Sequence, residues 1–169
     1  MTAERLNQND VDRVANALRQ ADSALFITGA GISADSGLPT YRGIGGLYDG
    51  ETTDDGIPIE VALSGPMFHE RPELTWTYIA EIERACRGAA PNRGHQVIAE
   101  FESRIARCWV LTQNVDGFHR RAGSTNVIDI HGDVHTLFCA KCREYRNEVV
   151  DYSELEMPPR CPLLSLIHI

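Results

Sequence analysis

A glycine-rich run over residues 28–43 is the part of this chain best suited to chemistry, because its spacing fits a loop that binds phosphate. Gly29, Gly31 and Ala34 match the dinucleotide fingerprint, in which one glycine allows a tight turn and another lets the backbone approach a pyrophosphate. A dehydrogenase continues from this fingerprint through a helix into a strand that ends in an acid about 20 residues later. Here Pro39 stops a helix early, so the run is predicted to cover a ligand as a loop.

Polar side chains follow two later apolar stretches. Gln113, Asn114 and Asp116 come after the first stretch, and their side chains can hydrogen-bond a ribose or a carboxamide. His131 comes after the second and can act as a general base near neutral pH. Taken singly, the three residues after the first stretch are also explained by a helix cap, and a single histidine is more often a structural residue than a catalyst. Together with the glycine run, they predict a nucleotide site with a proton acceptor.

Cysteines near the end of the sequence have the spacing of a metal site. Cys139 and Cys142 form a C-x-x-C pair, which is half of a tetrahedral zinc site, and Cys161 follows at a suitable distance. A closed structural zinc site needs four ligands, and the chain offers three cysteines here. His135 is an alternative fourth ligand, but it is expected to lie on the surface or in a substrate groove.

A sheet must position these segments, and alternating strands and helices predict a parallel sheet with ligands at the carboxyl ends of its strands. Strands are predicted over residues 24–28, 107–112 and 126–130. Helices are predicted over residues 10–21, 59–63, 66–87 with a break near 71–72, 91–102 and 117–122. The first helix, capped by Asn9 or Asp10, is expected to pack on the sheet through Val11, Val14, Ala15 and Leu18.

Composition narrows the class of protein. The net charge of -8 argues against a chain that coats nucleic acid, and no apolar stretch approaches the roughly 18 residues of a membrane span. The first residues lack the pattern of a signal peptide, and five cysteines in such a chain favour reduced thiols. The protein is therefore expected in the cytoplasm, without membrane or nucleic-acid partners. Cys86 and Cys108, in apolar surroundings, are predicted to be small core residues.

Four segments, in order, resemble the signatures of the sirtuins, the NAD-dependent protein deacylases. GAGISADSGLPTYRG resembles the first signature, and TQNVDGFH at 112–119 is similar to the family's TQNxDxLH. NVIDIHG at 126–132 resembles its strand ending in His-Gly, and CAKC at 139–142 its first zinc pair. The resemblance covers nearly all of residues 20–161. It implies a bacterial-type member with an α/β fold, namely a Rossmann-like parallel sheet with a helical insert and an incomplete small zinc-binding module, truncated at the C-terminus.

The resemblance also implies how the chain is divided. A single partial domain is expected to comprise a Rossmann-like core at 10–50 and 91–133, a helical insert at 51–90 and the start of the zinc module at 134–163. Residues 164–169 match the translation of a common transposase adapter used in DNA library preparation and are interpreted as an artefact. The family has its fourth cysteine at the position of Leu164. The family also continues beyond this chain with further sheet strands, whose absence leaves an unpaired edge and an exposed core face, so the chain as written is expected to be unstable or inactive.

Sirtuins consume NAD as a co-substrate: they transfer an acyl group from a protein lysine to ADP-ribose and release nicotinamide. The resemblance implies that His131 deprotonates a ribose hydroxyl after the acyl oxygen has displaced nicotinamide, and that Asn114 helps to position the ribose and a water. Arg42 would hold a phosphate and Tyr41 would shield the reactive ribose carbon. The implied NAD contacts are Gly29, Ala30, Gly31, Ser33, Tyr41, Arg42, Gln113, Asn114, Asp116 and His131, and the implied ligands of a structural zinc are Cys139, Cys142 and Cys161.

The acyl preference follows from two positions on the helical insert. Sirtuins that prefer succinyl or malonyl groups carry a tyrosine and an arginine where this chain has Ile79 and Ile82. Deacetylation, or removal of longer apolar acyl chains, is therefore predicted over desuccinylation. Two alternatives remain open: an NAD-dependent oxidoreductase with a Rossmann domain, and a non-catalytic binding module built on a zinc knuckle.

Overall fold

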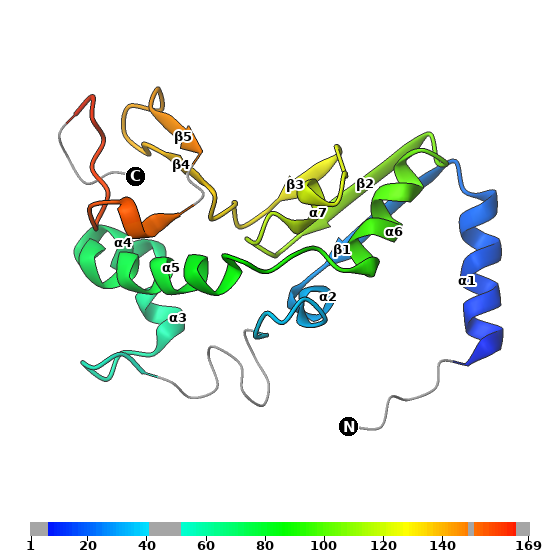
Figure 1. Ribbon diagram of the computed structural model, residues 1–169, viewed down its shortest axis with the longest axis horizontal. Helices are drawn as coiled ribbons and strands as arrows, with labels where there is room; N and C mark the ends of the chain where they lie inside the picture. The colour runs from blue at the N-terminus through cyan, green and yellow to red at the C-terminus, as the bar shows by residue number, and fades with distance from the viewer. Residues whose placement is uncertain (1–6, 41–51, 149–150, 165–169) are drawn as a thin grey trace.

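The computed structural model describes residues 7–40, 52–148 and 151–164, which form two lobes side by side (Figure 1). The first lobe contains β1 (Ser23–Thr28), α2 (Ala30–Ala34), α6 (Arg93–Glu102), β2 (Arg107–Thr112), α7 (Phe118–Arg121) and β3 (Val127–Asp129). The second lobe contains α3 (Ile59–Ala62), α4 (Gly65–Glu70), α5 (Pro72–Cys86), β4 (Thr136–Phe138), β5 (Arg146–Glu148) and the 3-10 helix η1 (Tyr152–Glu154). None of the helices in these described ranges is long and apolar enough to cross a membrane.

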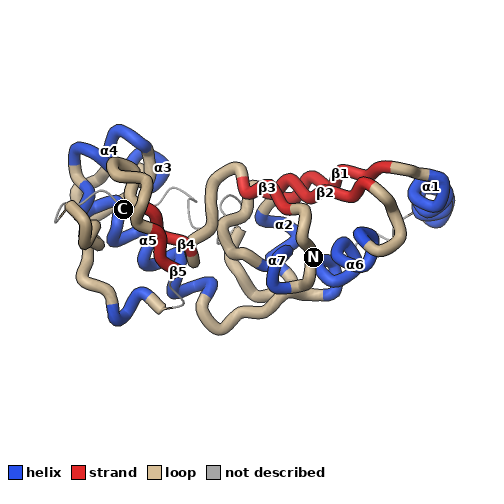
Figure 2. The backbone as a smooth tube through the Cα atoms, turned by 90° about the horizontal axis from the view of Figure 1, so that it is seen from above, coloured by secondary structure: helices blue, strands red, loops and turns tan. Residues whose placement is uncertain are grey.

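The three strands of the first lobe form a parallel sheet in the order β1-β2-β3. This confirms the predicted parallel arrangement and the predicted strands, although β3 is shorter than expected. Helices α2, α6 and α7 lie on the same side of the sheet (Figure 2). Ile98 of α6 packs there against Val110 and Val127 of the strands, and Phe26 and Ile32 complete this small core. One face of the sheet is therefore buried.

The opposite face of the sheet is apolar and exposed. Leu25 pairs with Trp109, and Ile27 lies in register with Leu111 and Ile128, so these side chains share one face. Leu25, Ile27 and Trp109 are 55%, 68% and 45% exposed. Parallel sheets are normally covered on both faces. Within the described part of the chain, this face has no covering layer (Figure 2).

Helix α1 (Gln8–Gln20) stands apart from the sheet at one end of the molecule (Figure 1). The expectation that it packs on the sheet is wrong, because none of its residues is buried and Val14 is 59% exposed. Only Ala21 and Asp22 separate the helix from β1, so it leaves the amino end of that strand and projects outward. Its N-cap is Asn7, whose side chain accepts a hydrogen bond from the Asn9 amide, and not Asn9 or Asp10.

The second lobe has a core shared by the helices and the cysteine segment. Trp76 of α5 packs with Leu137, Cys139, Tyr152 and Cys161. The predicted break near residues 71–72 is confirmed, since α4 ends just before it and α5 begins at a proline, which a first helical turn tolerates. Strands β4 and β5 form an antiparallel pair beside this core. The helical insert and the cysteine segment are therefore one packing unit.

The two isolated cysteines are buried, as predicted for core residues. Desolvation raises the pKa of Cys86 to about 12 and also raises the pKa of Cys108. Thiols held in this protonated form are poor nucleophiles and poor metal ligands. We assign both to packing.

Candidate active site

The carboxyl ends of the strands gather the predicted site segments at one edge of the sheet. Thr28 pairs with Thr112, and Thr112 pairs with Asp129, so the residues that follow these strands emerge side by side. A cavity of about 1090 Å³ opens at this edge. Its sheet-side lining includes Ala30, Gly31, Gln113, Asn114 and His131. The opposite wall comes from the second lobe and is largely apolar.

A buried hydrogen-bond network ties the glycine run to the segment after β2. The side-chain amide of Asn114 donates to the Gly29 carbonyl at 3.1 Å and to Ser33 Oγ at 3.0 Å. Ser33 Oγ in turn donates to Asp116 Oδ2 at 2.6 Å. Asn114, Ser33 and Asp116 are all buried. The network fixes these side chains before any ligand arrives.

Two features of this network fit a nucleotide. Asn114 Oδ1 is buried and has no hydrogen-bond partner among the described residues, although buried polar atoms are normally paired. No atom lies within 4 Å of a Cβ built at Gly29 or Gly31, so packing within the described chain does not require glycine at either position. An acceptor without a partner beside an open glycine turn suits a polar ligand that approaches the backbone closely.

His131 is exposed at the cavity and is oriented by its own backbone neighbourhood. Its Nδ1 lies 3.1 Å from the Gln113 carbonyl oxygen. Since a carbonyl only accepts, this contact assigns the proton to Nδ1 and leaves Nε2 with a lone pair. A neutral imidazole with a free Nε2 is the form that can take a proton from a bound substrate.

Two buried histidines behind the network were not identified from the sequence. His119 Nε2 lies 2.9 Å from Thr28 Oγ1, and the His95 ring is 4.9 Å from the His119 ring. Desolvation, followed by the charge of His95, lowers the pKa of His119 to about 4. Desolvation also lowers the pKa of His95, with a smaller opposing effect from Asp116. Both rings are therefore neutral near pH 7.

His95 extends the network through its two ring nitrogens. The backbone amide of Asn92 donates to His95 Nδ1 at 3.2 Å, and the other ring nitrogen, Nε2, lies 3.5 Å from Ser33 Oγ. Asn92 is the N-cap of α6, and His95 completes a capping box with it. An asparagine three residues before a side chain that can bond back is a recognisable helix start. That signal in the sequence could have identified His95 as a partner of the cap.

Tyr41 and Arg42, also expected at the cofactor, lie outside the described residues. The remaining predicted NAD contacts surround or underlie the cavity, and Ser33 and Asp116 form its buried support. His135 lines a second cavity of about 940 Å³ and is not grouped with the cysteines.

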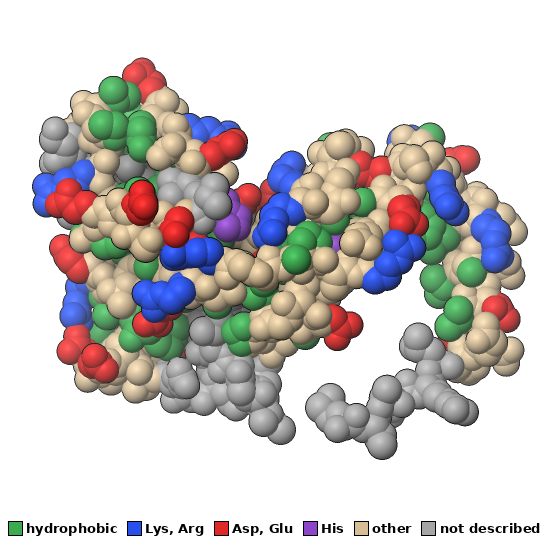
Figure 3. Space-filling model, in the orientation of Figure 1, with side chains coloured by type: hydrophobic (Ala, Val, Ile, Leu, Met, Phe, Trp, Pro, Cys, Tyr) green, Lys and Arg blue, Asp and Glu red, His purple; other side chains and the backbone are tan. Residues whose placement is uncertain are grey.

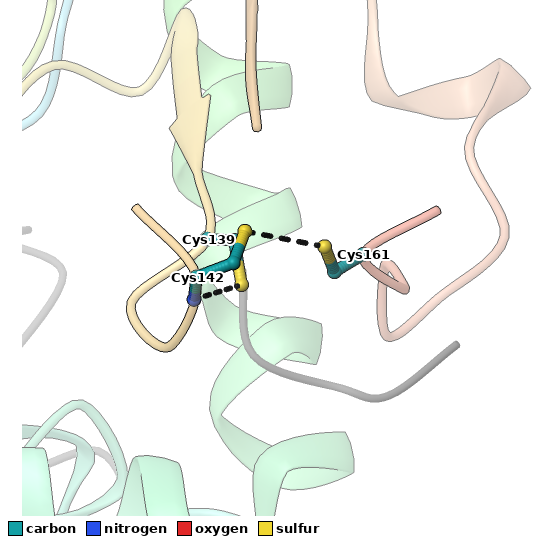
Figure 4. A group of neighbouring side chains, drawn as sticks. All are labelled: Cys139, Cys142 and Cys161. Atoms are coloured by element: carbon teal, nitrogen blue, oxygen red, sulfur yellow. Dashed lines mark hydrogen bonds between the residues drawn. The ribbon is translucent and has the colours of Figure 1, made fainter. Parts of the chain in front are cut away.

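The three cysteines predicted as metal ligands converge between the β4-β5 hairpin and the end of the chain (Figure 4). Their sulfur atoms all lie within 4.8 Å of one another, and the Cys142 and Cys161 sulfurs are 3.8 Å apart. Desolvation raises the pKa of the Cys139 thiol, but amide donors from Cys142 and Lys141 outweigh it and bring the pKa to about 7. Leu164 packs against this cluster. The residues therefore fit three of the four thiolates of a zinc site.

The sequence and the fold match one family. The model of the Sir2 family matches residues 29–166. The NAD-dependent protein deacylase 2 of Pseudomonas aeruginosa is 51% identical over 157 residues, covering 92% of this chain and 61% of that protein. Its namesake from Pseudomonas syringae pv. tomato is 54% identical over 153 residues, covering 89% of this chain and 61% of that protein.

A solved structure gives the same result. A crystal structure of a Sir2 homolog-NAD complex superimposes with a TM-score of 0.74 at 33% identity, covering 91% of this chain and 57% of that one. The expected Rossmann-like α/β fold is confirmed by this match. The chain spans about 60% of the length of the relatives it matches. The order of the motifs, the fold and the family match agree, and the chain belongs to the Sir2 family.

Proposed function

We propose that the complete protein is an NAD-dependent protein lysine deacylase that transfers an acyl group from lysine to ADP-ribose and releases nicotinamide. The observation that carries this proposal is the buried Oδ1 of Asn114, which has no hydrogen-bond partner among the described residues and lies beside an open glycine turn in the cavity that His131 also lines. NAD, when bound, supplies the electrophilic ribose carbon and the nicotinamide leaving group. The names of the relatives support the same activity.

Each side chain has a role that its contacts support. His131 would accept a proton at Nε2 because Nδ1 is engaged with the Gln113 carbonyl. Asn114 would present Oδ1, which no group in the described part of the chain engages, to a ribose hydroxyl, while its side-chain amide remains bound to Gly29 and Ser33. Asp116, held in place by the hydrogen bond from Ser33 Oγ, would orient the carboxamide of the cofactor. Gly29, Ala30, Gly31, Tyr41, Arg42 and Gln113 would complete the NAD contacts.

The wall contributed by the second lobe favours a neutral acyl group. Phe68, Ile79 and Ile82 line it, and the acidic residues of the cavity lining are Glu60 and Asp133. The described lining residues include neither lysine nor arginine. A succinyl carboxylate would lose its hydration there without gaining a cation, which is unfavourable. We therefore propose acetyl or longer apolar acyl groups as substrates, and an assay in which succinyl-lysine peptides react fastest would overturn this.

A structural zinc held by Cys139, Cys142 and Cys161 is part of the proposal, as is the division into a core at 10–50 and 91–133, an insert at 51–90 and a zinc module from 134. The residue at 164 tests the metal site directly. Leu164→Cys should tighten zinc binding, measured by competition with a chromophoric chelator. An equal affinity in both proteins would exclude position 164 as a ligand site. A cytoplasmic location is proposed because all five cysteines are free thiols.

The experiment is a turnover assay of the complete protein with NAD and an acetyl-lysine peptide. Nicotinamide and deacetylated peptide should form in equal amounts, and His131→Ala should lower kcat about 10³-fold, as expected for loss of a general base. His69→Ala, which removes an exposed histidine from α4, is the matched control and should leave kcat unchanged. An oxidoreductase would instead reduce NAD without releasing nicotinamide. A binding module would do neither.

A further inference from the structure

Tyr152 connects the cysteine-containing lobe to the backbone beside His131. Its hydroxyl donates a hydrogen bond to the carbonyl oxygen of Val134, and both residues are buried. Tyr152 lies in η1, between Cys142 and Cys161 in the sequence, whereas Val134 is three residues after His131. We propose that Tyr152 is a positioning residue for the loop over residues 131–134. The inference deepens the proposed function and rests on it for the identity of the reaction.

The loop that receives this hydrogen bond is attached at two points to the segment after β2. The Val134 amide donates to the Val115 carbonyl at 3.0 Å. His131 Nδ1 bonds the Gln113 carbonyl at 3.1 Å. Val115 lies between Asn114 and Asp116, so a single residue of the loop, Val134, accepts from Tyr152 through its carbonyl and donates to the cofactor segment through its amide. Asn114 and Asp116 are held separately by Ser33, so a shift of Val134 would chiefly displace the short loop that begins at His131.

Tyr152 is itself held firmly by α5. Its amide donates to Glu83 Oε2 at 3.4 Å, and Glu83 has no exposed surface. Arg87 binds this carboxylate through two nitrogens, at 3.0 and 2.6 Å, and also pairs with Asp151. A buried carboxylate is stable only when it is paired in this way. The ion pairs thus fix the backbone from which the tyrosine reaches Val134.

The ring of Tyr152 completes the connection to the cysteines. Its centroid is 6.2 Å from that of Trp76, and both rings belong to the core that contains Cys139 and Cys161. Protein interiors are close-packed and transmit small displacements. Tyr152 therefore links the cysteine segment to the His131 loop, in addition to the direct chain connection through β4. Loss of the hydroxyl would leave the buried Val134 carbonyl without this donor, and the loop would relax.

The test compares Tyr152→Phe with Tyr145→Phe in the complete protein. Tyr145 packs against the same core, and its hydroxyl has no recorded hydrogen bond among the described residues, so it is the matched control. In Tyr152→Phe, kcat should fall about 10-fold with the KM for NAD nearly unchanged, because misplacing a proton acceptor affects the reacting step. The ring resonances of His131, followed by NMR against pH, should shift and titrate with a changed midpoint. Tyr145→Phe should change neither quantity.

Unchanged His131 resonances and kcat in Tyr152→Phe would overturn the inference, as would equal changes in the control. If Tyr152→Phe does not fold, Asp151→Asn weakens the same support from the exposed side and should shift His131 in the same direction by a smaller amount. An unmoved His131 in that variant would also reject the proposal. The NMR titration needs no turnover. A wild-type protein that releases no nicotinamide would therefore refute the proposed function while the positioning role is still decided.

Discussion

The two faces of the three-stranded sheet differ in how completely they are buried. On the face covered by α2, α6 and α7, Val110 is fully buried and a polar network runs from Asn92 to Asp116. On the other face, Leu25, Ile27 and Trp109 stand exposed although they are as apolar as the buried core. The space-filling view shows how open the molecule is around α1 (Figure 3). Completeness of packing, and not polarity, distinguishes the faces.

This contrast separates the site from its setting. The hydrogen bonds that hold Asn114, Ser33 and Asp116 are all made within the described part of the chain, on the covered side of the sheet. The candidate site is therefore already organised in this chain. Exposed apolar patches of this kind mark interaction surfaces. The described chain covers about 60% of its relatives' length. The effect of a substitution on the free energy of unfolding should therefore depend on the face that carries it, and on whether it is made in this 169-residue chain or in a longer protein.

The largest expected effect is a loss of unfolding free energy at low pH, caused by protonation of the two neutral histidines, His95 and His119, on the covered side of the sheet. The folded protein lowers the pKa of His119 to about 4, below the ordinary value of about 6.5, so the unfolded chain binds the proton first. The stabilisation is fully present above pH 6.5 and is lost as the pH falls from 6.5 to 4, on the order of 3 kcal/mol. His95 adds in the same direction.

Urea unfolding between pH 7 and pH 4 measures this loss. His119→Gln should flatten the dependence over that interval, whereas His69→Ala, at an exposed site, should not. A His119→Gln protein as acid-sensitive as wild type would show that other groups determine the loss.

The second effect compares equivalent substitutions on the two faces. Val110→Ala removes two methyl groups from the covered core and should cost about 2 kcal/mol of unfolding free energy. Ile27→Ala, on the exposed face, should change it by less than about 0.5 kcal/mol in the 169-residue chain. In the complete protein the cost of Ile27→Ala should rise towards that of Val110→Ala if further chain covers this face. Equal costs in both proteins would show that the face remains open.

The sequence predicted the elements where a local signal determined them. Strands β1 and β2 were short apolar runs ended by polar or glycine residues, and Pro72 marked the start of α5. The prediction that α1 packs on the sheet was wrong because the spacing of its apolar residues specifies a face of the helix but not what covers that face. The same spacing would suit a helix packed on either face of the sheet or on a different partner.

The site was only partly predictable, for a related reason. The side chains after the strands were found because their position at strand ends is itself informative. His119 was quoted as the last residue of the TQNVDGFH motif but was given no role, because its contact with Thr28 joins residues 91 positions apart. The link from Tyr152 to Val134 was missed likewise. Contacts between residues far apart in the sequence depend on how their helices and strands pack, which no local pattern specifies.

The smallest expected effect on the free energy of unfolding concerns two helix caps, one on a helix that covers the sheet and one on a helix that buries none of its residues. Asn92 caps α6, which packs on the covered face. Its side-chain amide also donates to the Ile32 carbonyl at 2.6 Å and to Ser36 Oγ at 3.1 Å. Asn7 caps α1, which buries none of its residues. Asn92→Ala should lower the unfolding free energy by about 1 kcal/mol, as a lost N-cap does.

Asn7→Ala loses the same kind of cap but should leave the global unfolding free energy within about 0.5 kcal/mol of wild type, because fraying of α1 exposes no core. Amide hydrogen exchange distinguishes the two cases: Asn7→Ala should speed exchange within residues 8–20 only, and Asn92→Ala should also speed it in β2, against which α6 packs. Global destabilisation by Asn7→Ala would mean that α1 is docked in solution. The apolar face of the sheet, which lies nearest in sequence through β1, would then be where to look for it.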